Sequence, residues 1–198
     1  MRKLRKLHSR DMAIIRIIIF CVLLSFCDPA IPKAQENRPA AVADQFYPGN
    51  PDTLKFSVKT FFKNVPEPNV SGEMIGIITP HAGYIFSGLV AASAYKILLG
   101  KSYDTVIIVG ANHYDNFQGA SIYPGDGYET PLGIVHVNKE LAKSLALDEK
   151  LINLDRRGHG GREHSIEVQL PFLQSALNDF QIVPINIGTP DLTTCSAL

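Results

Sequence analysis

The sequence predicts an α/β fold in which a largely parallel sheet is flanked by helices. Short apolar runs alternate along the chain with segments of helical periodicity, which is typical of this class. Several of these runs are apolar on both faces, as expected for strands of a sheet that is covered on both sides. The 198 residues, 45% hydrophobic and 19% charged, are enough for one such domain with a buried core.

The predicted domain covers residues 52–198 and follows an extended arm at residues 35–51, rich in Pro, Ala, Asn and Gly. Its first helix lies around residues 54–62, where Asp52 or Thr53 can act as the N-cap. The remaining predicted elements are a strand at 74–79, a helix at 88–100 capped by Ser87, a strand at 103–110, a strand at 134–137, a helix at 139–148 capped by Asn138, a helix at 164–178 bent at Pro171, and a strand at 180–188.

The end of the predicted domain is unusual for a sheet of this kind. The last strand is followed only by "TPDLTTCSAL", which contains no helix long enough to pack back on the sheet. We therefore expect the fold to be incomplete at the C-terminus.

The first 34 residues differ in character from the rest. "MRKLRKLHSR" is cationic, and "IIIFCVLLSFC" is an apolar run of signal-peptide length rather than membrane-spanning length. "LLSFC" resembles a bacterial lipobox with Cys27 at the lipidated position, although Phe26 stands where a small residue is preferred. Residues 1–34 are thus interpreted as a signal peptide or N-terminal membrane anchor of an exported or membrane-tethered protein. The alternative is a cytoplasmic protein with a mis-assigned start codon.

Composition argues against several classes of function. The first 34 residues hold seven of the 19 Lys and Arg residues and two of the 19 acidic residues, so the remainder is acidic and shows no basic patch. Nucleic-acid binding is therefore not expected. Only Cys195 lies outside the leader, which excludes an internal disulfide in the domain. Fingerprints for dinucleotide binding, a P-loop or a nucleophile elbow are absent from the sequence.

Two histidines follow predicted strands at equivalent places. His81 lies two residues beyond Thr79 in "TPHAGYIF", and His113 lies three residues beyond Gly110 in "VIIVGANHY". Neighbouring parallel strands end at one edge of a sheet, about 4.8 Å apart, so both rings are expected at one rim. Imidazole is a common metal ligand, and Gly83 and Gly110 would allow close backbone approach. The alternative is that each ring caps backbone carbonyls or faces water.

A second group of candidate residues lies in "REHSIEVQLP". Glu163, His164 and Glu167 cluster at the start of a predicted helix. They could serve as a further metal ligand, as partners of a ligating imidazole, or as a general acid–base pair. The alternative is an acidic first turn that suits the helix dipole. Of the other histidines, His136 is interpreted as structural, and His159 has no partner predicted by spacing.

Several motifs together resemble a known family. "QFYPG", "TPHAGYIFSG", "VGANHY", "YETPLG" and "EHSIEVQLPFL" occur in the order and at the spacing of the Memo family, whose prokaryotic members are also called AmmeMemoRadiSam system protein B. The resemblance spans residues 38 to about 190. It implies a fold similar to that of class III extradiol dioxygenases. The family is longer than this chain, so the resemblance also implies a C-terminally truncated copy.

The resemblance assigns roles to individual residues. His81 of "PHAG" and His113 of "GANHY" match the metal-ligating histidines of the family, and His164 of "EHSIE" matches a motif residue near that site. The implied ion is iron, with copper as the alternative. The part of the family that is absent here carries a further ligand, so a third protein ligand is expected to be missing from this chain.

The expected function is that of a Memo-like protein whose metal site resembles non-haem iron dioxygenases. In this reading the chain is a metal-dependent redox enzyme in which His164, Glu163 and Glu167 are catalytic. The alternative is a non-catalytic scaffold of the AmmeMemoRadiSam system that uses the same cleft and loop 111–133 for binding. AMMECR1-like and radical SAM proteins are the expected partners under the resemblance. Aromatic anchors in that loop would be Tyr114, Phe117, Tyr123 and Tyr128.

Overall fold

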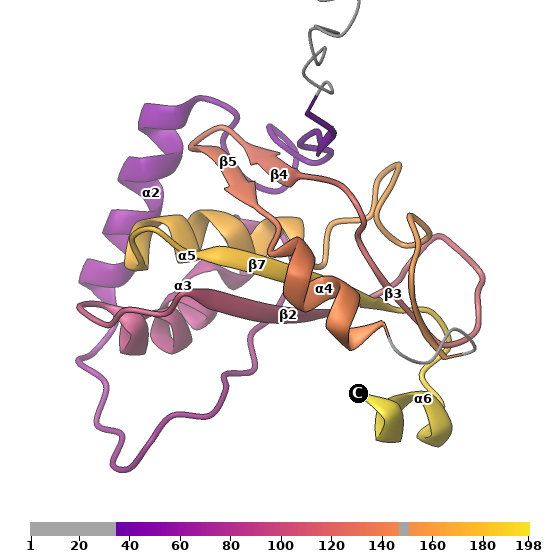
Figure 1. Cartoon of the computed structure of the whole chain (residues 1–198). Coiled ribbons are helices and arrows are strands. Elements are labelled where there is room, and N and C mark those ends of the chain that lie inside the picture. The colour runs from indigo at the N-terminus through magenta and orange to yellow at the C-terminus, as the bar shows by residue number, and fades with distance from the viewer. Residues whose placement is uncertain (1–34, 147–150) are drawn as a thin grey trace, which may run out of the picture. The chain divides into compact units, whose positions relative to one another are not determined.

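The computed structural model describes residues 35–146 and 151–198 (Figure 1). The predicted leader at residues 1–34, with the lipobox-like Cys27, lies outside the described residues. Residues Gln35–Leu198 form one compact unit. Within the described ranges, no helix is both long enough and apolar enough to cross a membrane.

The described chain combines helices with strands in two sheets, which confirms the predicted α/β class, although β2 to β5 follow one another without a helix between them. The strands are β1 (Asn37–Arg38), β2 (Thr105–Ala111), β3 (Ala120–Ile122), β4 (Gly127–Thr130), β5 (Gly133–His136), β6 (Ile152–Leu154) and β7 (Gln181–Ile187). The helices are α2 (Pro51–Asn64), α3 (Tyr84–Tyr95), α4 (Lys139–Leu145), α5 (Leu170–Ala176) and α6 (Leu192–Ala197), with single 3₁₀ turns η1 (Lys96–Leu98) and η2 (Glu167–Gln169).

The strands form two sheets. One sheet has the order β2-β7-β3-β6, and the other has the order β1-β4-β5. The pairs β2–β7, β3–β6 and β1–β4 are parallel, whereas β3–β7 and β4–β5 are antiparallel. Parallel pairing therefore predominates among the described strands, as predicted, although the strands are divided between two sheets.

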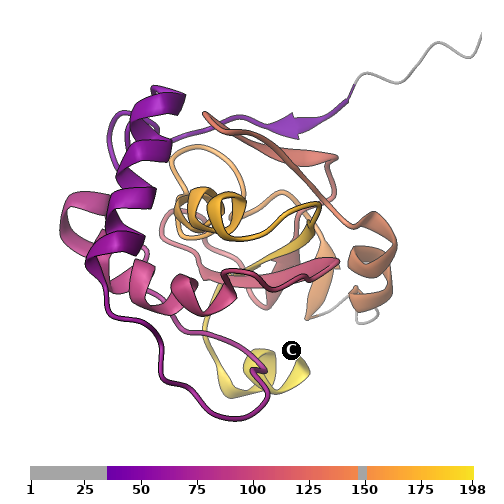
Figure 2. The same cartoon turned by 90° about the vertical axis from the view of Figure 1, so that its left-hand side faces the viewer.

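Helices α2, α3 and α5 pack against one another (Figure 2), and an aromatic cluster joins them. The ring of Phe172 on α5 lies 4.8 Å from that of Tyr84 and stacks at 5.3 Å on that of Tyr95, both on α3. Phe61 and Phe62 of α2 also contact the Phe172 ring, with centroids at 6.3 and 5.9 Å. Such ring pairs contribute roughly 0.5–1.5 kcal/mol each beyond the area they bury. The cluster fixes the three helices against one another and so positions the loop that precedes α3.

The helix caps agree with the sequence in one case and differ in others. Asn138 accepts a hydrogen bond from the amide of Leu141, which confirms it as the N-cap of α4. The first helix starts at Pro51, and its cap is Asn50 rather than Asp52 or Thr53. Proline favours the first helical position because its missing N–H needs no partner there. Helix α2 therefore starts closer to the N-terminus than predicted.

Two other predicted helix boundaries, those of α3 and α5, are also wrong. Helix α3 begins at Tyr84, and Ser87 lies inside it, donating its hydroxyl to the carbonyl of Ala82. Pro171 does not bend a longer helix; it lies in the first turn of α5, directly after η2. A proline in the first turn starts a helix, whereas one in the interior bends it.

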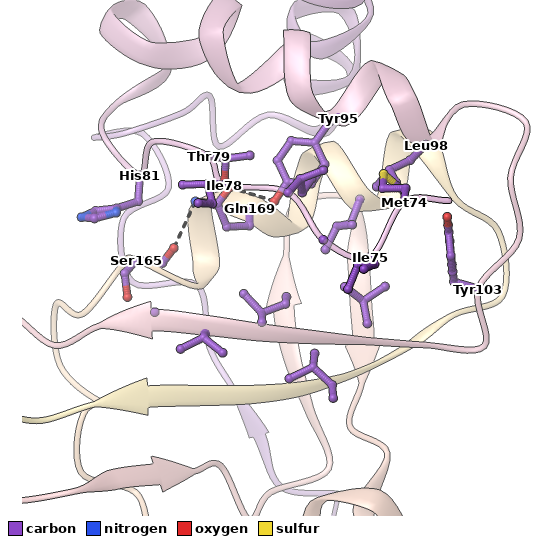
Figure 3. Close-up of a pocket in the computed structure, with 18 of the residues that line it drawn as sticks. Met74, Ile75, Ile78, Thr79, His81, Tyr95, Leu98, Tyr103, Ser165 and Gln169 are labelled. Atoms are coloured by element: carbon purple, nitrogen blue, oxygen red, sulfur yellow. Dashed lines mark hydrogen bonds between the residues drawn. The ribbon is translucent and has the colours of Figure 1, made fainter. Parts of the chain in front are cut away.

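The predicted strand at residues 74–79 is not formed. Residues 74–79 carry no assigned secondary structure and have no strand partner among the described residues, and Ile75 and Ile78 are fully exposed. A cavity of about 760 Å³ separates this segment from β2, the strand that was expected to be its neighbour (Figure 3). The apolar pattern predicted a strand, but a ladder of hydrogen bonds requires an adjacent strand, and the described residues supply none.

Candidate metal centre

Three histidine rings converge beyond the end of β2. His113 follows β2 by two residues, His81 precedes α3, and His164 precedes η2. The ring centroids of His113 and His164 are 4.7 Å apart and nearly parallel. The centroid of His81 lies 5.1 Å from that of His113 and 6.1 Å from that of His164. The two histidines predicted from the strand ends are therefore close together, and a third joins them.

The spacing of these rings suits a shared ion. Imidazole nitrogens bind transition metals at about 2.1 Å, which places the centroids of two rings on one ion roughly 5 Å apart. Candidate ligand atoms of His113, Glu163 and His164 all lie within 4.8 Å of one another. The chain thus has a candidate metal-binding cluster. A third protein donor was expected to be missing, but the structure brings His164 and Glu163 to His113.

Glu163 is held by the backbone that surrounds it. Its Oε1 accepts hydrogen bonds from the amides of His164 at 2.7 Å and Ser165 at 2.8 Å. Its Oε2 accepts one from the amide of His113 at 2.7 Å. Burial alone would raise the pKa of this carboxyl, but the hydrogen bonds from Ser165 and His113 outweigh it and hold the pKa below its ordinary value. Glu163 is therefore an anchored carboxylate that joins the end of β2 to the segment before η2.

The same contacts select the free nitrogen on two of the rings. Nδ1 of His113 lies 3.1 Å from Oε1 of Glu163, and Nδ1 of His164 lies 3.2 Å from the carbonyl oxygen of Arg162. Both partners are acceptors, so in the neutral form of each ring Nδ1 carries the proton and Nε2 keeps its lone pair. Two rings are thereby fixed in the tautomer that offers Nε2 to an ion.

His81 is half-buried and lies closest to His113. Burial lowers the pKa of its imidazole, and the neighbouring rings of His113 and His164 lower it further. A lowered pKa keeps the ring neutral at neutral pH, and neutral imidazole is the form that binds metals. The electrostatics of the cluster therefore favour a ligating form of His81.

Aromatic and cationic side chains form the wall of the site. Tyr114 was predicted as an aromatic anchor, whereas Phe46 and Arg162 had no predicted role. The ring of Phe46 lies 4.4 Å from that of His164. Tyr114 is 54% exposed, and its ring lies 6.2 Å from that of His113. The guanidinium of Arg162 lies over the Tyr114 ring at 5.3 Å. Phe46 belongs to "QFYPG", so its place in a recurrent motif was the available signal.

Glu167, one of the predicted catalytic residues, lies in a different environment. Its carboxylate is buried, pairs with Arg38 at 2.5 Å and accepts the hydroxyl of Tyr47 at 2.5 Å. It also accepts the backbone amides of Ala41 and Val42. All of these partners belong to the N-terminal arm. The structure therefore brings His164 and Glu163 to the histidine pair, whereas Glu167 anchors the arm.

The remaining candidate residues are not in the cluster. His159 is buried, with Nδ1 at 2.6 Å from the Tyr128 hydroxyl and Nε2 at 3.0 Å from the carbonyl of Ser121. His136 is exposed on β5. Of the four aromatic residues expected to serve as anchors in loop 111–133, three are buried in the domain and Tyr114 is exposed; the buried ones are Phe117, Tyr123 and Tyr128.

The fold and this site define an α/β protein with a histidine-rich candidate metal centre. The family model described as Memo-like protein matches residues 38–198, and the chain belongs to that family. A MEMO1 family protein of Pyrococcus abyssi is 40% identical over 81% of this chain and 56% of its own length. Those of Thermoplasma volcanium and Methanosarcina barkeri are 41% and 42% identical over 76% and 79% of the chain. The chain spans little more than half the length of these relatives.

Proposed function

We propose that the chain carries a metal-dependent redox centre held by His81, His113 and His164, with iron as the ion and copper as the alternative. The observation that carries the proposal is the convergence of three imidazoles from three separate segments, two of them with Nδ1 fixed by an acceptor. Chance clustering of neutral imidazoles would not require their second nitrogens to be bound in this way.

The donor set suits the proposed ions. Imidazole is a ligand for iron, copper and zinc, and a bound redox-active ion would supply one-electron chemistry and Lewis acidity at this rim. The residues of the chain have distinct roles in the proposal. Glu163 positions His113 through the ring nitrogen and His164 through the backbone, while Phe46 covers one side of the His164 ring. His164 is thus proposed as a ligand rather than as a proton carrier.

The exposed rim offers groups that can orient a substrate. Tyr114 provides a hydroxyl and a ring face, and Arg162 adds a positive charge beside it. A substrate with an anionic or phenolic oxygen would find a complementary donor at this place. The redox proposal therefore favours a substrate of that class over an apolar one.

Anaerobic Fe(II) titration of the full chain tests the proposal. Wild type should bind one ion per chain, and His81→Ala, His113→Ala and His164→Ala should each weaken binding at least tenfold. Glu163→Gln should weaken it roughly 10- to 100-fold, because one carboxylate acceptor becomes an amide donor next to the backbone amides. His136→Ala, an exposed ring outside the cluster, is the matched control and should bind like wild type. Equal, weak binding by all variants would end the proposal.

The scaffold alternative has a separate readout. AMMECR1-like and radical SAM proteins stay predictions as partners, and capture of either by the full chain can be compared between wild type and the three histidine variants. A scaffold that does not use the ion would retain its partner in all of them. Substitution of Tyr114, the exposed aromatic residue of loop 111–133, would then be expected to reduce capture.

A further inference from the structure

The cavity between residues 74–79 and β2 has the form of a slot (Figure 3). It is lined by every residue of β2 and by every residue from Met74 to Thr79. Successive side chains of a strand point to opposite faces, so a cavity that touches every residue of β2 lies along the edge of that strand rather than over one face. The slot therefore follows the backbone edge of β2 for about 20 Å, the length of a seven-residue strand, with residues 74–79 as its other wall.

The edge of β2 that faces the slot has no strand partner among the described strands, because β2 ends the order β2-β7-β3-β6. The amide of Asn112 donates to Ile187, and the carbonyl of Asp104 accepts from Gln181, so even-numbered residues of this stretch face β7. Backbone groups alternate in direction along a strand. The N–H and C=O groups of Ile107 and Val109 consequently point away from β7, toward the free edge.

The side chains around the slot are apolar and unusually exposed. Ile75 and Ile78 are fully exposed, and Ile107 and Val109 are 50% and 52% exposed. The hydroxyl of Ser165 also lines the slot. Ser165 is 3% exposed, and its Oγ has no hydrogen-bond partner within the described part of the chain. Apolar walls, a free backbone edge and an unpaired buried hydroxyl are together what an inserted strand would cover.

We propose that this slot binds an extended apolar segment as an additional β-strand, hydrogen-bonded to the free edge of β2, and that the segment comes from the part of the Memo-like family that this chain does not span. The relatives continue for over two fifths of their length outside the match. Part of that length would fill the slot, which is an unfilled apolar edge of the shared portion. The proposal does not depend on the metal centre.

A second copy of this chain fits the slot poorly. Its own β2 is bonded to β7 along the full strand, so a copy that offered β2 would have to bring its whole sheet between the two walls. The slot is bounded by residues 74–79 on one side and by β2 on the other. A separate, single extended segment would bring no sheet between these walls.

Fragment complementation tests the proposal. The probe is the longest stretch of the Pyrococcus abyssi relative that lies outside the match, produced as a separate polypeptide and titrated into the full 198-residue chain. We expect a 1:1 complex, and hydrogen exchange should slow at the amides of residues 107 and 109. Ile107→Pro should weaken binding about tenfold or more, because it removes one free-edge donor and no bond to β7. Ile107→Ala is the matched control, since it keeps the donor.

The other outcomes overturn the proposal. Absence of binding, or binding that leaves exchange on β2 unchanged, would mean that the slot does not accept this segment. Self-association of the chain that is lost in Ile107→Pro would assign the edge to a second copy instead. Exchange on the wild-type chain decides the matter even if Ile107→Pro fails to fold.

Discussion

The imidazole of His159 lies in the interior, 2% exposed, between Tyr128 and the carbonyl of Ser121. Burial lowers its pKa to about 4 from an ordinary value of 6.5. The bond to the carbonyl requires a proton on Nε2, so Nδ1 accepts the Tyr128 hydroxyl in the neutral ring. Protonation would force Nδ1 to become a donor and would place a charge near Arg38, whose guanidinium also lowers this pKa.

His159 is therefore predicted to weaken the fold in acid. The unfolded chain binds a proton at His159 below about pH 6.5 and the folded chain only near pH 4, so stability is full above 6.5 and falls between these values by roughly 3 kcal/mol. His159→Gln, which can keep both hydrogen bonds, should flatten this part of the curve. Chemical denaturation from pH 7 to pH 4 measures it, with His136→Gln as control. An unchanged slope in His159→Gln would contradict the prediction.

For individual residues, the sequence predicted that His81 and His113 lie close together, but it did not predict the groups that surround them. His81 and His113 could be paired because both follow extended runs, and a strand end is visible in a sequence. Glu163 was recognised as a candidate, and it accepts hydrogen bonds from three backbone amides. One of these amides belongs to His113, 50 residues away, and that contact depends on the fold. The partners of His159 could not be predicted, because Tyr128 and Ser121 reach it only through the two sheets. Gly110 is needed for close approach, since a Cβ there would lie 2.5 Å from Ser165 Oγ.

The segment from Glu163 to Gln169 connects two parts of the molecule. Its first residue binds the end of β2, and Glu167, one turn later, binds the N-terminal arm through Arg38 and Tyr47. Side chains four apart on a helical turn lie on related faces, so one short element can serve both connections. Because Phe46 of that arm packs on His164, the contacts of Glu167 with the arm also shape the candidate metal centre.

Loss of Glu167 is predicted to be costly. Glu167→Ala leaves the guanidinium of Arg38 buried without its counter-charge, which should lower the free energy of unfolding by about 3–5 kcal/mol. Arg38→Met combined with Glu167→Leu should recover part of this loss, while the amides of Ala41 and Val42 stay unpaired. Urea denaturation measures both changes. Glu140→Ala, from an exposed pair with Lys143, is the control and should change stability by less than about 1 kcal/mol.

Helices and strands were predicted correctly where local sequence signals determine them. The prediction failed where a strand depends on pairing with another strand. Asn138 and the strand around β7 needed only capping chemistry and apolar periodicity. Residues 74–79 have the same apolar character, yet they form no strand, since strand formation depends on a neighbour that sequence periodicity does not reveal. The two imidazoles nevertheless meet, because the turn after Pro80 is held by Gln169, whose Nε2 donates to the carbonyl of Pro80.

At the scale of the whole molecule, residues Gln35–Leu198 are a compact unit in which the edge of β2 borders the slot. Its core spans both sheets and the helices, while exposed Ile75 and Ile78 lie opposite β2 across the slot. Burial of an isoleucine side chain stabilises a fold by roughly 1.5–3 kcal/mol relative to exposure, so these two residues contribute little to the unit as it stands.

Polar substitution of these two residues should confirm this. Ile75→Ser with Ile78→Ser is predicted to change the free energy of unfolding by less than about 1 kcal/mol in total, because both side chains are fully exposed. Ile182→Ala, at a buried position of β7, should lower it by about 2–5 kcal/mol. Thermal or urea denaturation of the full chain compares them. A loss from the double variant as large as that from Ile182→Ala would show that the slot is closed in solution.

The anchoring of Glu163 has a consequence for how the protein would acquire an ion. Three main-chain amides and one ring nitrogen hold this carboxylate in place, and none of those bonds needs a metal. The rings of His113 and His164 are therefore ordered when the chain folds. The entropy cost of ordering them is part of folding and not of ion binding. Capture of an ion should then resemble docking into a rigid receptor, in contrast to small zinc modules, where the ion itself drives the chain to collapse.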